Sequence, residues 1–259
     1  MASFQFLGTG ASAGIPVIGC KCDICHSTSA CNKRMRPAGL LRVDGKKILI
    51  DVGPDFRQQA LQFGIDHVDG LLLTHTHSDH IAGVDDLRIF FVRGHKPVPC
   101  LLSQESAQEL CKRYDYLFAQ PKDKASLTAQ LELHILKHNM GHTEFLGLRI
   151  GYCSFYQSSM QVTGWKIGRF AYISDIREYE ISIFDALQGT DLLVLSALRK
   201  EASPLHLTLD EAVVFARRVG AKKTYLTHIS HTLEHESTNR FLPPDVQLGY
   251  DGQQLEFSL

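Results

Sequence analysis

The sequence predicts an α/β fold in which two β-sheets pack face to face between outer layers of helices, an αββα sandwich. Three observations lead to this prediction. Strand patterns dominate the start of each half of the chain, and a helix–strand alternation follows them. Of the 259 residues, 44% are hydrophobic and 21% are charged, which is typical of a chain that buries a sizeable core. No linker rich in Pro, Gly or Ser divides the chain, so we expect a single domain over residues 1–259.

Alternating apolar residues and turn signals place the elements of the first half. Asp44-Gly45 is a strong two-residue hairpin signal, and it joins strands predicted at 38–43 and 46–51. Further strands are predicted at 3–7, 68–74 and 98–102, and helices at 55–63, 85–92 and 104–114. The strand at 68–74 is expected to be buried and to carry a histidine-rich segment at its C-terminal end.

The second half is predicted in the same way. Its strands are expected at 131–137, 148–156, 161–167, 170–174, 191–195, 222–227, 246–250 and 254–257. One helix is expected around 179–187. Another begins at the capping box Thr208-Leu209-Asp210-Glu211 and runs to Val219.

Charge and hydropathy restrict the partners. The formal net charge of -1 supplies no general basic field, so nucleic acid is an unlikely partner and local groups must hold the substrate. The longest apolar stretches are too short to span a bilayer, so we expect no membrane partner. The first residues lack the basic and apolar regions of a signal peptide, and we expect a cytoplasmic protein.

The segment Thr74–His80, with the sequence Thr-His-Thr-His-Ser-Asp-His, predicts a metal centre. In an extended segment His75 and His77 project to the same side and can share one ion. If the chain turns into a helix at Ser78, Asp79 and His80 face a second ion. Imidazole and carboxylate are ligands for zinc, manganese or iron. A chance polar run on a loop is the alternative, and the buried strand before the segment argues against it.

This pattern, H-x-H-x-D-H, resembles the signature of the metallo-β-lactamase superfamily, which implies the metallo-β-lactamase fold. The resemblance implies a later aspartate that bridges two metals and a last histidine, each at the end of a strand. Asp175 and His228 match these positions in order. Taken alone, an Asp or His at a strand end is more often a cap or turn residue.

Three further segments resemble one branch of that superfamily, the PhnP-type phosphodiesterases of the carbon–phosphorus lyase pathway. These segments are residues 7–16, 19–25 and 226–231. The resemblance implies that three thiolates and one imidazole bind a structural zinc that staples a loop at about 19–36. The implied ligands are Cys20, Cys22, Cys25 and His231.

The cysteines themselves also favour metal ligation. Three of the seven lie within residues 20–25, and without an export signal such crowding indicates a metal site better than disulfides. Free thiols are the alternative reading, and Cys31 could replace one ligand. Cys100, Cys111 and Cys153 lie in strand or helix patterns, so we expect them in the core.

One position departs from the branch. Its members have a further metal-binding histidine at the end of the strand before the bridging aspartate, and here that position falls on Gln157. Gln157 is a candidate metal ligand through its amide oxygen. An amide oxygen is a poorer ligand than imidazole, so the ion at His75 and His77 loses its third histidine. The other ion keeps a complete set of ligands: Asp79, His80, Asp175 and His228.

Asp79 and His206 are the candidate catalytic residues. In the branch, a histidine before a capped helix protonates the leaving group, and His206 matches it; a capping or packing role is the alternative. The basic run at 32–36 could hold a phosphate, but we favour a solvated surface turn. We interpret His138 and His142 as loop residues.

The resemblance implies a phosphodiesterase that acts on a small cyclic phosphate or nucleotide-like diester, with Mn²⁺ or Zn²⁺ as one or two catalytic ions. A homodimer is possible. A transfer-RNA 3′-processing nuclease is a second reading, but no Gly- and basic-rich insertion that would grip RNA is present. A lactonase or thioesterase is a third. The non-enzyme alternative is a metal-binding accessory protein resembling pyrroloquinoline quinone synthesis protein B.

Overall fold

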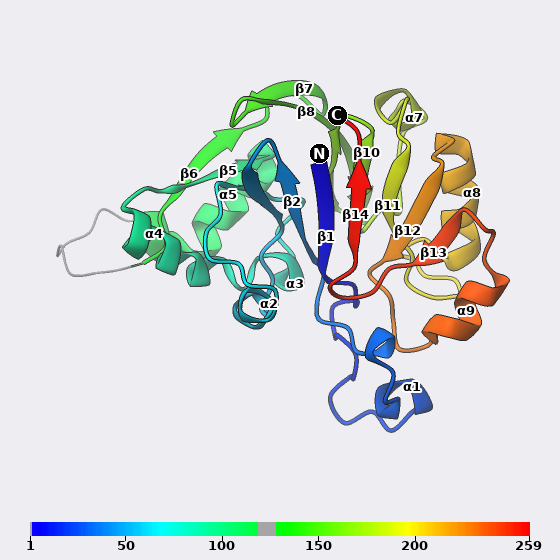
Figure 1. The fold of residues 1–259 in the computed structure, drawn as a ribbon. Coiled ribbons are helices and arrows are strands. Elements are labelled where there is room, and N and C mark those ends of the chain that lie inside the picture. Colours follow the sequence, from blue (N-terminus) through cyan, green and yellow to red (C-terminus); the bar gives the residue numbers. More distant parts are fainter. Residues whose placement is uncertain (1, 119–127) are drawn as a thin grey trace.

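Two mixed seven-stranded sheets pack face to face, and helices cover their outer faces (Figure 1). The computed structural model describes residues 2–118 and 128–259. The predicted αββα sandwich is therefore confirmed. The chain begins and ends on neighbouring antiparallel strands of one sheet, so the two termini lie close together.

The first sheet has the strand order β14-β1-β2-β3-β4-β5-β6. Its strands are β1 Ala2–Gly8, β2 Ala38–Val43, β3 Lys46–Ile50, β4 Gly70–Leu72, β5 Val98–Leu102, β6 Leu131–Ile135 and β14 Gln254–Phe257. Pairing is antiparallel from β14 to β3 and parallel from β3 to β6. Between β2 and β3, Asp44 and Gly45 both have positive φ, as a tight hairpin requires.

The second sheet has the order β13-β12-β11-β10-β9-β8-β7. Its strands are β7 Met140–Phe145, β8 Leu148–Gln157, β9 Met160–Ile167, β10 Phe170–Ile173, β11 Leu192–Ser196, β12 Lys223–Thr227 and β13 Val246–Leu248. The interpretation of His142 as a loop residue is wrong, because it lies in β7 and pairs with Gly151. β7 is a mostly polar edge strand without clear apolar alternation, which is why its pattern was missed. His138 does lie in a loop.

The helices match the predicted ones except at four places. The α-helices are α1 Asp23–His26, α2 Phe56–Gln62, α3 Ser78–Ile81, α4 Arg88–Gly94, α5 Gln104–Arg113, α6 Asp115–Phe118, α7 Ile183–Ala186, α8 Leu209–Val219 and α9 His235–Phe241. Two 3₁₀ turns are η1 Ala30–Asn32 and η2 Val84–Leu87. The predictions missed α1, α6 and α9. They also made α7 too long, because Glu178 instead bridges Tyr156 of β8.

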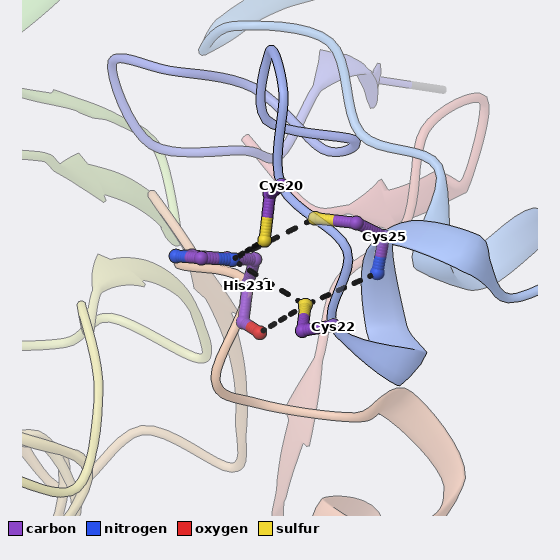
Figure 2. A group of neighbouring side chains, drawn as sticks. All are labelled: Cys20, Cys22, Cys25 and His231. Atoms are coloured by element: carbon purple, nitrogen blue, oxygen red, sulfur yellow. Dashed lines mark hydrogen bonds between the residues drawn. The ribbon is translucent and has the colours of Figure 1, made fainter.

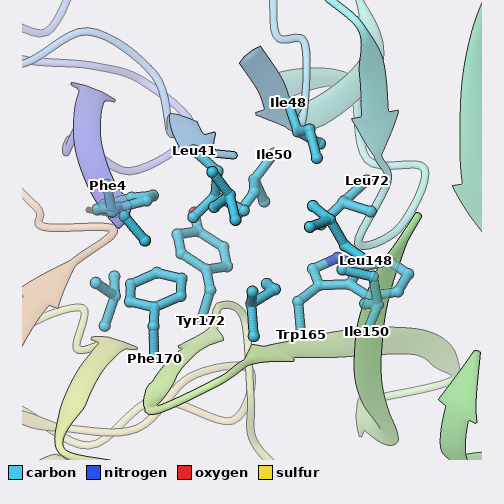
Figure 3. Close-up of a cluster of buried hydrophobic side chains, with 14 of the residues drawn as sticks. Phe4, Leu41, Ile48, Ile50, Leu72, Leu148, Ile150, Trp165, Phe170 and Tyr172 are labelled. Carbon is cyan, nitrogen blue, oxygen red and sulfur yellow. The ribbon is translucent and has the colours of Figure 1, made fainter. Parts of the chain in front are cut away.

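Strand alternation explains the three-layered core. Along β3, Ile48 and Ile50 face the opposite sheet, whereas Leu49 faces the outer helices. Figure 3 shows how aromatic and aliphatic side chains from both sheets, including Phe4, Trp165 and Tyr172, fill the space between them. Both faces of each sheet are thus covered, which leaves the sheet edges for polar chemistry.

The cysteine and arginine predictions had mixed outcomes. Cys100 and Cys153 are buried as expected, but Cys111 is only half-buried. The basic run is not a solvated turn at its centre, because Arg34 is 2% exposed. Its guanidinium donates to Thr9 Oγ1 at 2.7 Å and to the Gly249 carbonyl at 2.5 Å. Arg34 therefore ties the cysteine-bearing loop to the first and last parts of the chain.

The described part of the chain contains no helix that is both long and apolar enough to cross a bilayer.

Candidate metal centres

The polar segments that the sequence singles out meet at one edge of the two sheets. Thr74–His80 follow β4 of the first sheet, while Asp175 and His228 follow β10 and β12 of the second. His206 lies in the loop between β11 and α8. Because parallel strands end at the same edge of a sheet, side chains from both sheets converge there.

His75 and His77 lie side by side as predicted. His75 Nε2 is 2.9 Å from His77 Nδ1, so the two nitrogens are close enough to bind the same ion. The other nitrogen of His75, Nδ1, lies 2.9 Å from Thr74 Oγ1. The Thr74 hydroxyl donates its proton to the Asp51 carboxylate, so its oxygen accepts a hydrogen bond from His75 Nδ1. His75 Nε2 is then free to bind an ion.

Four side chains lie close together beside this pair. His80 Nε2 lies 3.2 Å from Asp175 Oδ2 and 3.6 Å from Asp79 Oδ2. His228 Nε2 lies 3.2 Å from Asp175 Oδ1 and 3.4 Å from Asp79 Oδ2. Ligand atoms of one zinc lie about 3.4 Å apart, so Asp79, His80 and His228 could share an ion. Asp175 turns a different oxygen to each histidine, as a carboxylate at the border of two ion positions would. His80 Nε2 is buried without a hydrogen-bond partner, as expected for an atom that binds a metal.

Asp51 contacts His80 on the ring nitrogen that faces away from the other proposed ligands. The sequence did not indicate this role. The Asp51 carboxylate accepts from His80 Nδ1 at 2.7 Å and from the Thr74 hydroxyl at 2.8 Å. Burial raises the pKa of Asp51, and His80 opposes that shift. Burial would lower the pKa of His80, but the carboxylates of Asp175, Asp79 and Asp51 hold it well above its usual range. A positive charge is therefore favoured where an ion would lie.

The backbone is strained at this edge. Asp51, Asp175 and His228 have φ of 62°, 58° and 58°, a region that non-glycine residues seldom occupy. Such conformations persist where surrounding contacts enforce them, and they concentrate at functional sites. The three residues are the ones that lie at the strand ends, where the chain must turn its side chains inward.

Gln157 and His206 border the four-residue set. Gln157 Nε2 is 3.1 Å from Asp175 Oδ1 and 3.0 Å from His206 Nε2. The His206 ring stacks on His228 with centroids 4.6 Å apart. Burial lowers the pKa of His206 to about 4, and the neighbouring His228 acts in the same direction. His206 therefore faces the centre as a neutral imidazole at neutral pH.

The second cluster joins residues 20–25 to His231, in the turn that follows β12. Figure 2 shows the sulfurs of Cys20, Cys22 and Cys25 around the ring of His231. Their distances from His231 Nδ1 are 3.3, 3.5 and 3.6 Å. A tetrahedral zinc with three sulfurs and one nitrogen requires about 3.6 Å. The Cys25 amide and His231 lower the pKa of Cys22 to about 6, which favours the thiolate. Cys31 is not part of this group.

A family model described as the beta-lactamase superfamily domain matches residues 46–229, more than half of the chain. The chain therefore belongs to the metallo-β-lactamase superfamily. Its clusters of His, Cys and Asp side chains could hold metal ions. The chain is similar over its whole length to a solved structure described as a new diphosphatase from the PhnP family. The two share 38% sequence identity with a TM-score of 0.91, covering 100% of this chain and 99% of the other.

Two other proteins are similar to this chain. The octanoyltransferase of Porphyromonas gingivalis (strain ATCC BAA-308 / W83) is 34% identical over 249 residues, 95% of this chain. This chain spans only 50% of that protein, so the name can refer to its other half. Zn²⁺-bound PqqB from Methylobacterium extorquens shares 18% identity at a TM-score of 0.77, over 98% of this chain and 100% of PqqB, and shows the common fold.

Proposed function

We propose that this chain is a metal-dependent phosphodiesterase that acts on a small cyclic phosphate or a nucleotide-like diester. The main support is the close grouping of Asp79, His80, Asp175 and His228 at the sheet edge, where each imidazole nitrogen lies 3.2–3.6 Å from two carboxylates. The full-length similarity to a PhnP-family diphosphatase supports phosphorus as the centre attacked. The proposed structural zinc lies in the cysteine cluster, and Mn²⁺ or Zn²⁺ fits the histidine and carboxylate cluster.

Bound divalent ions would supply a nucleophile from water at neutral pH and offset charge on the substrate oxygens. The remaining chemistry belongs to the chain. Asp51 holds the His80 ring with its free nitrogen toward the other ligands. His206, 7% exposed and beside Asp175, is placed to pass a proton to the leaving group. Its low pKa means that it must gain that proton when the negatively charged substrate binds.

The partners and location follow from charge and cysteine chemistry. The net charge of -1 favours a small substrate over nucleic acid. All seven cysteines are free, as expected in the reducing cytoplasm, which is where we propose the protein acts. A homodimer remains a prediction that gel filtration with light scattering would test.

The direct test is hydrolysis of bis(p-nitrophenyl) phosphate and of a ribose cyclic phosphate by the protein supplied with Mn²⁺ or Zn²⁺. We expect turnover that falls to background in His80→Ala, because this change removes the imidazole nitrogen that lies near both Asp79 and Asp175. His142→Ala is the matched control, since His142 is exposed in β7. Absence of turnover in the metal-loaded wild type would contradict the proposal and favour the accessory-protein alternative.

A second candidate is hydrolysis of an acyl thioester. The relative from P. gingivalis is named an octanoyltransferase, and a metal-activated nucleophile attacks carbonyl carbon as well as phosphorus. Assaying an octanoyl thioester in parallel separates the two. A higher kcat/KM for the thioester than for both phosphodiesters would replace the leading proposal.

A further inference from the structure

The proposed catalytic cluster consists of His75, His77, Asp79, His80, Asp175 and His228. The side chain of Gln157 lies beside it and is only 4% exposed. Gln157 is the last residue of β8. Its Nε2 lies 3.1 Å from Asp175 Oδ1 and 3.0 Å from His206 Nε2. An amide has one end that donates and one that accepts. Next to the Asp175 carboxylate, the donating end is favoured because two oxygens at this distance would repel each other. The neighbour therefore decides the orientation of the amide.

The ligand inventory is uneven between the two halves of the cluster. Around His80 and His228, Asp79 Oδ2 lies 3.6 and 3.4 Å from the two ring nitrogens, and Asp175 places one oxygen 3.2 Å from each. Around His75 and His77 there are two imidazole nitrogens, and Asp175 is already shared with the first set. The donating end of an amide cannot bind a cation. Gln157 thus adds no ligand on the side where one is lacking.

We propose that Gln157 is a positioning residue that donates to Asp175 and His206, and that the catalytic cluster consequently holds one tightly bound ion rather than two. This inference rests on the proposed function only in treating the cluster as a metal centre. The ion is held by Asp79, His80, Asp175 and His228. His75 and His77 are left as neutral imidazoles that face the substrate, while Gln157 keeps Asp175 turned toward the bound ion.

The test is a count of metal ions per chain by elemental analysis after dialysis against metal-free buffer. We expect two ions in the wild type, one in each cluster. Gln157→Leu keeps the volume but removes the amide, so the count should stay at two. Gln157→His and Gln157→Glu each add a ligand, so both should reach three. His228→Ala should fall to one, which identifies the ion that belongs to the catalytic cluster.

Electron paramagnetic resonance of the Mn²⁺-loaded protein gives an independent readout. A single ion predicts an isolated Mn²⁺ spectrum in the wild type and an exchange-coupled pair in Gln157→His. Three ions in the wild type with two in Gln157→Leu would show that Gln157 is a ligand and overturn the inference. One ion in the wild type would overturn it as well. If the leucine variant fails to fold, the wild-type count and the histidine variant still decide.

Neither readout depends on which bond the protein hydrolyses. A negative phosphodiesterase assay with two ions per chain would reject the proposed function and leave the role of Gln157 intact. Turnover of phosphodiesters by a chain with three ions would support the proposed function and reject the role inferred for Gln157.

Discussion

At the scale of single residues, the centre depends on a carboxylate that touches no reacting group. Asp51 is fully buried and accepts hydrogen bonds from His80 Nδ1 and from both the amide and the hydroxyl of Thr74. These bonds fix which nitrogen of His80 is free to bind an ion. Partners of this kind orient ligands and raise their basicity.

Asp51→Asn should therefore weaken metal binding while leaving all proposed ligands in place. The amide keeps the volume but loses the charge and one acceptor, so we expect about 10–100-fold lower affinity at the catalytic cluster. Competition with a chromogenic chelator measures this. Asp66→Asn is the control, because Asp66 is an exposed carboxylate paired with Lys47. Equal affinities in both variants would show that Asp51 does not orient His80.

Residues whose partners are close in sequence could be interpreted from the sequence, and residues whose partners are distant could not. The pattern of Thr74–His80 could be interpreted because both its strand and its turn are local. The structure has the helix at Ser78 that the interpretation required. Asp51 could not be found in this way. Its strand end was predicted, but its role comes from His80, which lies 29 positions away and approaches only when β3 and β4 pair. Arg34 is a similar case, since its acceptors are far away in sequence.

At the scale of elements, the turn after β12 links the two clusters. His228 and His231 are three positions apart, and the backbone between them is held on two sides. Ile229 donates to the Thr9 carbonyl at 2.9 Å and accepts from Ala11 at 3.0 Å. Ser230 donates at 3.0 Å to Leu198, in the loop that carries His206. An ion at His231 would thus restrain a segment that also places catalytic groups.

This connection predicts that Cys22→Ser reduces metal affinity at the catalytic cluster, although Cys22 does not touch it. Couplings between sites amount to roughly 5–150-fold in affinity, and we expect an effect in this range. Isothermal titration with Mn²⁺ measures it. Cys31→Ser is the matched control, a nearby cysteine outside the cluster. An unchanged catalytic affinity in Cys22→Ser, with the structural ion lost, would show that the two clusters are independent.

Elements differ in how well the sequence predicts them. Strands that face apolar layers, such as β5 at Val98–Leu102, match the prediction to the residue, because alternation and burial act on the same side chains. The polar edge strand β7 and the short helix α1 escaped notice. Neither shows the apolar periodicity of a core element, and α1 lies within the loop that the cysteine cluster holds.

At the scale of the whole molecule, the clusters join regions that are distant in the sequence. The cysteine cluster connects residues 20–25 to His231, and the catalytic cluster joins strand ends from both sheets. The loop around α1 projects past the edge of the sheets (Figure 1), and polar contacts of Arg34 and Asn32 also attach it to the rest of the chain. Ions that bind only the folded chain stabilise it by mass action.

Removing the ions should therefore lower the melting temperature markedly. At free metal a thousand times the dissociation constant, one ion contributes about 4 kcal/mol, which for a chain of this size corresponds to roughly 10 °C. Acidification should act in the same direction, because thiolates and imidazoles must stay unprotonated to bind metal. Differential scanning calorimetry with and without a chelator, at pH 7.5 and pH 5.5, measures both effects. In Cys22→Ser the chelator should cause a smaller drop, since one ion is already lost. If the chelator leaves the wild-type melting temperature unchanged while elemental analysis shows that both ions have gone, the fold does not depend on its metals.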